Sequence, residues 1–260
     1  MLTWLYRIPE PLVLALTAGL LAALSVGVPY LVQRLRFVRP NDLNTEFVTR
    51  TWAPLFTMTA LVLAFTLVEA DTNFRRVDAQ VTTEASQLNQ LDRLLVRYGS
   101  ADASKVRPLL LAYTRSIVRD EWPEMLKGGS SEKTAAAFSP ISQGIMALQP
   151  EPGRETVIYT EMLKLLEASA VSRDTRLNDV HVGLPAIYWE VIAFSMAMLL
   201  LVSGTVERTG HRVLVIAAQV AVLGAFIGFA FIMDTPFLGD TAVTSDAIAH
   251  VAAVIEKRMH

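Results

Sequence analysis

The stretch that decides the fold runs from Trp52 to Tyr98 and reads WAPLFTMTALVLAFTLVEADTNFRRVDAQVTTEASQLNQLDRLLVRY. Its first part, 52–68, contains no charged residue and is long enough, as a helix, to cross the hydrocarbon core of a bilayer. Beyond Glu69 the apolar residues recur at intervals of three, four and seven, which is the spacing of one face of an amphipathic helix. The residues on this face are Val77, Val81, Leu88, Leu91, Leu95 and Tyr98. We therefore predict a single helix that leaves the membrane and continues into a polar region.

Three further apolar stretches have the length of a membrane-spanning helix, at 11–32, 184–206 and 213–233. Among them only 184–206 contains a charged residue, Glu190, which is either an interfacial charge beside an aromatic belt or an ion-coordinating carboxylate. The chain is 52% hydrophobic and 18% charged, with a mean hydropathy of +0.39, and so carries less charge than a soluble domain. These features predict an all-α membrane protein with four transmembrane helices.

The four spans divide the chain into four parts. The first two transmembrane helices lie in 1–70, and the third and fourth lie in 184–234. Between them, 71–183 has nearly equal numbers of acidic and basic residues and shows only helical periodicity, which predicts an extended helical polar domain. The last part, 235–260, is predicted to form a turn and an amphipathic helix.

Two runs rich in glycine and proline, at 128–131 and 149–153, predict linkers inside the polar domain. A helix that ends near Trp122 precedes the first linker, and a long helix at about 155–180 follows the second. The C-terminal helix is expected to have Ser245 as its N-cap and to present one apolar side. The residues on that side are Ile248, Val251, Ile255 and Met259.

The sequence offers no set of residues for a catalytic or metal site. It has no cysteine, and its four histidines are far apart and lack the spacing of metal ligands. Neither a phosphate-binding glycine loop nor a nucleophile elbow is present. The net charge of −2, without a strongly basic segment, argues against nucleic acid as a partner. We therefore predict that the protein is not an enzyme and has no cofactor and no bound metal.

A mostly polar stripe follows the second span. Its members occupy every seventh position and are Trp52, Thr59, Thr66, Asn73, Gln80 and Gln87. Because lipid does not solvate such a face, we expect it to contact water or protein. One interpretation is a pore wall on an axis shared by identical subunits, lined by Thr59, Thr66 and Asn73. Leu63 would then be the narrowest apolar ring and a gate that closes by dewetting. The other interpretation is a contact between helices, in which the threonine hydroxyls bond to their own helix.

Charged residues mark the end of the second span. Glu69 and Arg76 each lie three positions from a member of the stripe, and both are candidates for ion selection at a pore mouth. The alternative interpretation is that they only mark the boundary between the membrane span and the solvent, where charged residues are common. In the fourth span, Gly224 and Gly228 are spaced for close packing against another helix.

The stretch 231–240, at the end of the fourth span, reads FIMDTPFLGD. Its motif residues are Asp234, Pro236, Phe237, Gly239 and Asp240. They resemble the Asp/Asn-Pro-Phe-Gly-acidic motif that follows the last span of bestrophins. Further matching pieces are Glu69, 120–122, 173–177 and 184–185. On these pieces the chain resembles the bacterial bestrophin-like family of four-span membrane proteins.

The resemblance implies an oligomeric ion channel, pentameric in bestrophins, whose second span lines the pore and whose helices extend it into the polar domain. Two features depart from bestrophins. The dense acidic run that binds calcium is reduced here to Asp234, Asp240 and Asp246, so calcium gating is not implied. The second span also lacks the spacing of the aromatic neck, because it offers only Phe56 and Phe65.

We therefore expect a homo-oligomeric ion channel of the cell inner membrane. Its partners would be its own copies, small inorganic ions and the lipid bilayer. The alternative is a membrane-anchored sensor or scaffold whose helical domain binds a partner protein. Basic residues at 34–50 and 208–212 place the two short loops in the cytoplasm by the positive-inside rule. By that rule the polar domain would lie outside the cytoplasm, whereas bestrophins have their large domain in the cytoplasm. The sequence therefore does not decide on which side of the membrane the polar domain lies.

Overall fold

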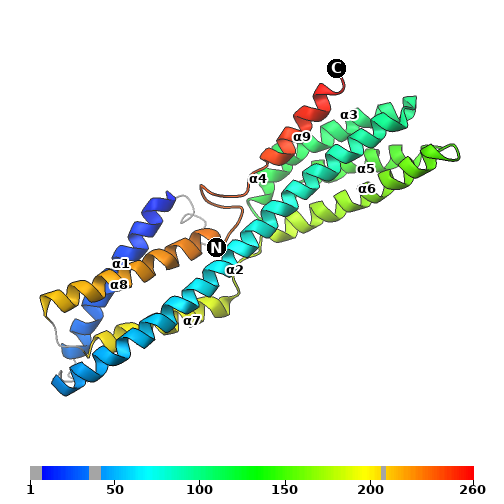
Figure 1. Cartoon of the computed structure of the whole chain (residues 1–260). Coiled ribbons are helices and arrows are strands. Elements are labelled where there is room, and N and C mark those ends of the chain that lie inside the picture. The colour runs from blue at the N-terminus through cyan, green and yellow to red at the C-terminus, as the bar shows by residue number, and fades with distance from the viewer. Residues whose placement is uncertain (1–7, 35–41, 206–208) are drawn as a thin grey trace. The chain divides into compact units, whose positions relative to one another are not determined.

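The computed structural model describes residues 8–34, 42–205 and 209–260, and every regular element in these ranges is a helix (Figure 1). In chain order the elements are α1 (Glu10–Arg34), α2 (Asp42–Tyr98), α3 (Ala101–Ser116), the π-helix η2 (Ile117–Glu121), α4 (Trp122–Met125), α5 (Glu132–Met146), α6 (Arg154–Asp179), α7 (Ala186–Ser203), α8 (Gly210–Met233) and α9 (Asp246–Lys257). The predicted all-α fold is therefore confirmed. The basic loops used above to orient the chain lie partly at 35–41 and 206–208, outside the described residues.

The described chain divides into two compact units. The membrane unit comprises the described residues up to Phe74 together with Gly183–Thr235 and Gly239–Thr241. The polar unit comprises Arg75–Val182, Pro236–Leu238 and Ala242–His260. Four helices are long and apolar enough to cross a membrane, namely α1, α2, α7 and α8, which confirms the predicted spans. The prediction of one uninterrupted helix is also confirmed, because α2 runs for 57 residues.

In the membrane unit, α1 and α8 lie side by side (Figure 1). Gly224 on α8 meets the backbone of α1: a Cβ atom added there would lie 2.8 Å from the Thr17 carbonyl oxygen and 2.9 Å from the Ala18 Cα. One turn on, a Cβ at Gly228 would lie 2.4 Å from the Thr17 hydroxyl oxygen. The two glycines therefore allow the close helix contact expected from their spacing.

We expect Gly224→Val to destabilise the membrane unit by about 1–3 kcal/mol, because the new side chain would collide with α1 backbone atoms that cannot move aside. Thermal unfolding of the purified protein in detergent measures the effect. The matched control is Gly19→Val on α1, where no other group lies within 4 Å of an added Cβ. Equal unfolding midpoints for the two variants would contradict the close contact.

Helix α2 packs in the membrane unit through one apolar cluster. The cluster consists of Trp52, Leu63, Ile192, Met196, Leu199, Leu200, Val220 and Leu223, from α2, α7 and α8. A polar contact supplements it, because the indole Nε1 of Trp52 donates to the Gln219 side-chain oxygen at 3.0 Å. Such a bond satisfies two polar groups that lipid would leave unpaired.

In the polar unit, the apolar face predicted for α2 forms the core. All six of its residues, from Val77 to Tyr98, are buried. The helix ends at Gly99, whose φ of 78° suits a residue without a side chain. The next residue, Ser100, begins α3 as its N-cap, because its hydroxyl accepts from the Ala103 N–H at 3.0 Å.

The structure differs from two predictions for the polar domain. Helix α5 follows the 128–131 linker and was not expected. Its N-cap is Ser131, whose side chain accepts from the Thr134 N–H at 3.3 Å. The helix was not predicted because it has too few large apolar residues to show a helical periodicity. Ser245 stands at the N-cap of α9, but its side chain makes no capping hydrogen bond. The Asp246 N–H donates to the Thr244 hydroxyl at 3.4 Å.

Of the apolar residues predicted for α9, Ile248, Val251 and Ile255 are buried. Met259 is 37% exposed and lies beyond the helix, which ends at Lys257. The predicted apolar side of α9 is therefore correct except for its last member.

Candidate functional site

Within the membrane span, the stripe members on α2 and the nearby Leu63 face the interior of the single chain. Thr59, Leu63 and Thr66 are each only 1% exposed. The hydroxyls of Thr59 and Thr66 donate to the Leu55 and Val62 carbonyls of their own helix, both at 2.9 Å. A residue on an axis between subunits must be accessible in one subunit, so this burial favours the alternative interpretation, a packing contact with self-bonded threonines. The pore-facing role of these three residues stays a prediction.

The stripe members beyond the membrane span are less uniform. Asn73 is half-buried, so its predicted pore-facing role stays a prediction. Gln87, in the polar unit, accepts from the Ser172 hydroxyl of α6 at 2.9 Å. The polar half of the stripe therefore also includes a contact between helices.

A different face of α2 is bare in the membrane unit. Met58, Leu61, Phe65 and Val68 are 66%, 54%, 65% and 64% exposed, and we call them the exposed row. They follow one another at intervals of three, four and three, which keeps them on one helix face. Leu61 and Phe65 each lie two positions from Leu63, or about 200° around the helix. The exposed row is therefore on the side opposite the packed stripe.

The two candidates for ion selection have different surroundings. Glu69 follows the exposed row directly and is half-buried in the membrane unit. In the polar unit, Arg76 contacts Asp179 at 3.3 Å between Nη1 and Oδ1, with 49% of the arginine side chain exposed. Because this carboxylate already offsets its charge, Arg76 is the weaker candidate for attracting an anion.

Asp234 closes α8 and binds the turn before α7. One of its carboxylate oxygens accepts from the Leu184 N–H, and Gly183 packs so closely that an added Cβ would lie 3.1 Å from the same oxygen. A backbone N–H therefore holds this carboxylate. Burial raises the pKa of Asp234, while the hydrogen bonds from Leu184 and the Trp189 side chain act in the opposite direction.

The residues after Asp234 form a turn, and Pro236–Leu238 belong to the polar unit. Phe237 is buried and packs edge-on against Trp122, with ring centroids 5.8 Å apart. Pro236 accepts from the Val243 N–H at 2.7 Å, and Gly239 adopts a φ of 108°, which glycine favours. Asp240 is exposed. The motif therefore acts here as a structural corner.

The polar unit also contains a buried group of four charged residues, which we call the charge cluster. Its members are Glu84 on α2, Glu121 on η2, and Arg173 and Arg176 on α6. Arg176 is fully buried and bonds to both carboxylates: its Nε lies 2.6 Å from Glu84 and its Nη2 lies 2.8 Å from Glu121. Arg173 binds Glu121 as well, through Nε at 3.0 Å. Two cations thus balance two anions, and of the four side chains only that of Arg173 is partly exposed, at 15%.

The neighbours of the charge cluster connect it to the C-terminal corner. The Arg176 guanidinium lies 5.5 Å from the ring of Trp122, which also packs on Phe237. Burial opposes the charge of Arg176, but the two glutamates outweigh it and hold the pKa of Arg176 above its ordinary value. Arg176 is therefore held in place by both carboxylates and by the Trp122 ring.

The family model described as "Bestrophin-like domain" matches residues 19–248. The chain belongs to the bestrophin-like family. The resemblance found in its motifs is thereby confirmed. No curated protein sequence matches this bestrophin-like chain.

Solved structures agree on the fold of this bestrophin-like chain. A crystal structure of a bacterial bestrophin homolog from Klebsiella pneumoniae has a TM-score of 0.65 at 14% identity, with 94% of this chain and 96% of that chain covered. A variant of that homolog with one leucine replaced by threonine has a TM-score of 0.65 at 14% identity, with 95% of this chain and 97% of that chain covered. A further crystal structure, described as a membrane protein, has a TM-score of 0.66 at 15% identity, with 94% of this chain and 97% of that chain covered. At such identities the likeness shows the fold alone.

The charge cluster was missed as a group because its members are far apart in the sequence of this bestrophin-like chain. Two signals were available: Glu84 interrupts the apolar face of α2 between Val81 and Leu88, and the family-like pieces 120–122 and 173–177 contain the other three members. A carboxylate on a core face demands a cation, but the sequence does not say which one. Within the described residues no group of three or more His, Asp or Glu residues could hold a metal ion.

Proposed function

We propose that the chain is one subunit of a homo-oligomeric, pentameric ion channel in the cell inner membrane, and that the exposed row of α2 lines its pore. Family membership and the bestrophin fold support an ion channel as the kind of protein. The observation that carries the proposal is the exposed row itself, on the one membrane-spanning helix of the described chain that continues into the polar unit.

Symmetry converts the exposed row into a pore wall. When identical subunits surround an axis, a residue that faces the axis repeats as a ring of equal side chains. Phe65 is the largest residue of the exposed row, so its ring is the narrowest. A narrow apolar ring expels water and thereby blocks ions, which makes Phe65 the gate in place of the buried Leu63.

The ion-selecting position lies next to the exposed row in this proposal. Glu69 comes directly after Val68 and would contribute one carboxylate per subunit at the end of the narrow segment. A ring of carboxylates attracts cations. Arg76 and Asn73 would contact ions only weakly, because the first is paired and the second is half-buried.

The oligomer is tested by the mass of the purified protein in detergent, since one chain has a mass of 28.6 kDa. The proposal expects a protein mass five times that value, together with ion flux into liposomes that contain the protein. A monomer without flux would contradict it. A different closed ring with flux would correct the subunit number and leave the pore in place.

A further inference from the structure

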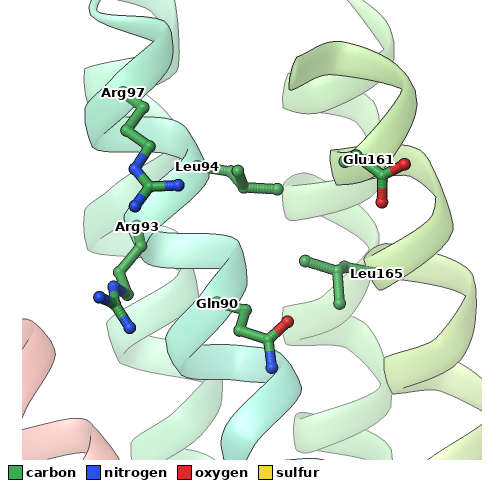
Figure 2. Close-up of a pocket in the computed structure, with 6 residues that line it drawn as sticks. All are labelled: Gln90, Arg93, Leu94, Arg97, Glu161 and Leu165. Carbon is green, nitrogen blue, oxygen red and sulfur yellow. The ribbon is translucent and has the colours of Figure 1, made fainter. Parts of the chain in front are cut away.

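The polar unit has a small open cavity between α2 and α6. It has a volume of about 260 Å³ and is lined by Gln90, Arg93, Leu94, Arg97, Glu161 and Leu165. Sites for drug-sized ligands have volumes of roughly 300–1,000 Å³, so this one would take a smaller molecule. The first four residues come from α2 and the other two come from α6 (Figure 2).

The cavity carries a net positive charge, because Arg93 and Arg97 outnumber the one carboxylate that lines it, Glu161. Arg93 and Arg97 are four positions apart and share a helix face, although like charges at this spacing repel. In the described part of the chain neither forms an ion pair, whereas Arg107, Arg115 and Arg173 of the same unit each hold a carboxylate.

The surroundings of the two arginines add to the positive potential. The guanidinium of Arg154 donates to the Arg97 carbonyl at 3.2 Å, which brings a third cation to this end of the cavity. The carboxylate on the opposite wall, Glu161, is offset by Lys164, whose Nζ lies 2.8 Å from it. An anion in the cavity would therefore meet an excess of positive charge.

An apolar wall completes the cavity. Figure 2 shows Leu94 and Leu165 pointing toward each other from α2 and α6, with Gln90 below them. Arginine forms bidentate hydrogen bonds with phosphate, and two arginines match the double charge of a phosphate monoester. The leucines would contact an apolar substituent on that phosphate.

We propose that this cavity binds a small phosphate monoester, with its phosphate on Arg93 and Arg97 and its apolar part against Leu94 and Leu165. The site lies within one subunit, so it goes beyond the proposed channel and does not depend on the pore. Binding needs no metal ion and no covalent step.

The test is calorimetric titration of the full-length protein in detergent with phenyl phosphate and, separately, with inorganic phosphate. We expect one phenyl phosphate per chain, bound about tenfold more tightly than inorganic phosphate because of the apolar wall. Changing both Arg93→Gln and Arg97→Gln should weaken phenyl phosphate binding at least about tenfold. The matched control is Arg119→Gln, which removes an exposed arginine of the same unit outside the cavity and should change the affinity less than about twofold.

Several results would overturn this site. One is the absence of saturable binding, and another is equal affinity of the double variant and the original protein. A third is an equal loss in Arg119→Gln, which would indicate a general effect of surface charge. Equal affinities for the two phosphates would overturn the role of the leucine wall.

Thermal unfolding checks that the double variant is folded. If the double variant does not fold, the single variants Arg93→Gln and Arg97→Gln are titrated in its place. Liposome flux without phosphate binding would overturn the site alone, and binding without flux would overturn the channel alone.

Discussion

Arg176→Met is expected to destabilise the polar unit by about 3–5 kcal/mol. The substitution removes the cation that bonds to both Glu84 and Glu121 and leaves Glu84 buried without its ion-pair partner. Methionine fills a similar volume, so the loss would come from the uncompensated charge rather than from a cavity. For a chain of this size the unfolding midpoint should fall by roughly 6–20 °C in a thermal melt.

The exposed pair of Lys105 and Asp102 provides the control. Lys105→Met removes a cation whose side chain is 76% exposed, and it should cost less than about 1 kcal/mol. A midpoint of Arg176→Met within about 2 °C of the original protein would contradict the role of the charge cluster.

Phe65→Ser is expected to raise ion flux through liposomes about tenfold, which corresponds to lowering the barrier by about 1.4 kcal/mol. A serine ring is wider and holds water, so the narrow segment would no longer dewet. The control is Phe194→Ser on α7, because Phe65 and Phe194 have the same exposed fraction, 65%, in the single chain. On the proposed arrangement Phe194 faces lipid and its replacement leaves the flux unchanged.

Equal effects of the two substitutions would show that Phe65 faces lipid as Phe194 does. The mass of each variant must match that of the original protein, since a changed oligomer would alter flux for another reason. Leu63→Ser belongs to a different class of change, because Leu63 is buried within the subunit. It should lower stability, not open the pore.

Apolar periodicity predicted the helices well but did not identify which side of α2 packs inside the membrane unit, and both results have a physical cause. The face from Val77 to Tyr98 is in water, where only one side of the helix is apolar, so the pattern identifies the core. In the membrane both sides of α2 are apolar. Thr59 and Thr66 looked distinctive, but each satisfies its hydroxyl on its own helix and can therefore be packed inside.

The charge cluster and the Asp234 corner show the same limit for polar groups. Glu84 on a core face and Asp234 before a proline are each signals in the sequence that a polar partner is needed. The partners, Arg176 and the Leu184 N–H, lie far away in the chain and were identified only by the fold. Local spacing can therefore locate a buried charge, while three-dimensional packing decides what neutralises it.

The most direct test of the central claim is the water accessibility of the exposed row in the assembled protein. The sequence contains no cysteine, so Phe65→Cys would introduce a single thiol. A charged, membrane-impermeant methanethiosulfonate reagent reacts with thiols that contact water and not with thiols in lipid. We predict that the reagent modifies Phe65→Cys and changes its ion flux, while Phe194→Cys stays unmodified. An unreactive Phe65→Cys with unchanged flux, in an intact oligomer, would contradict a pore lined by this face of α2.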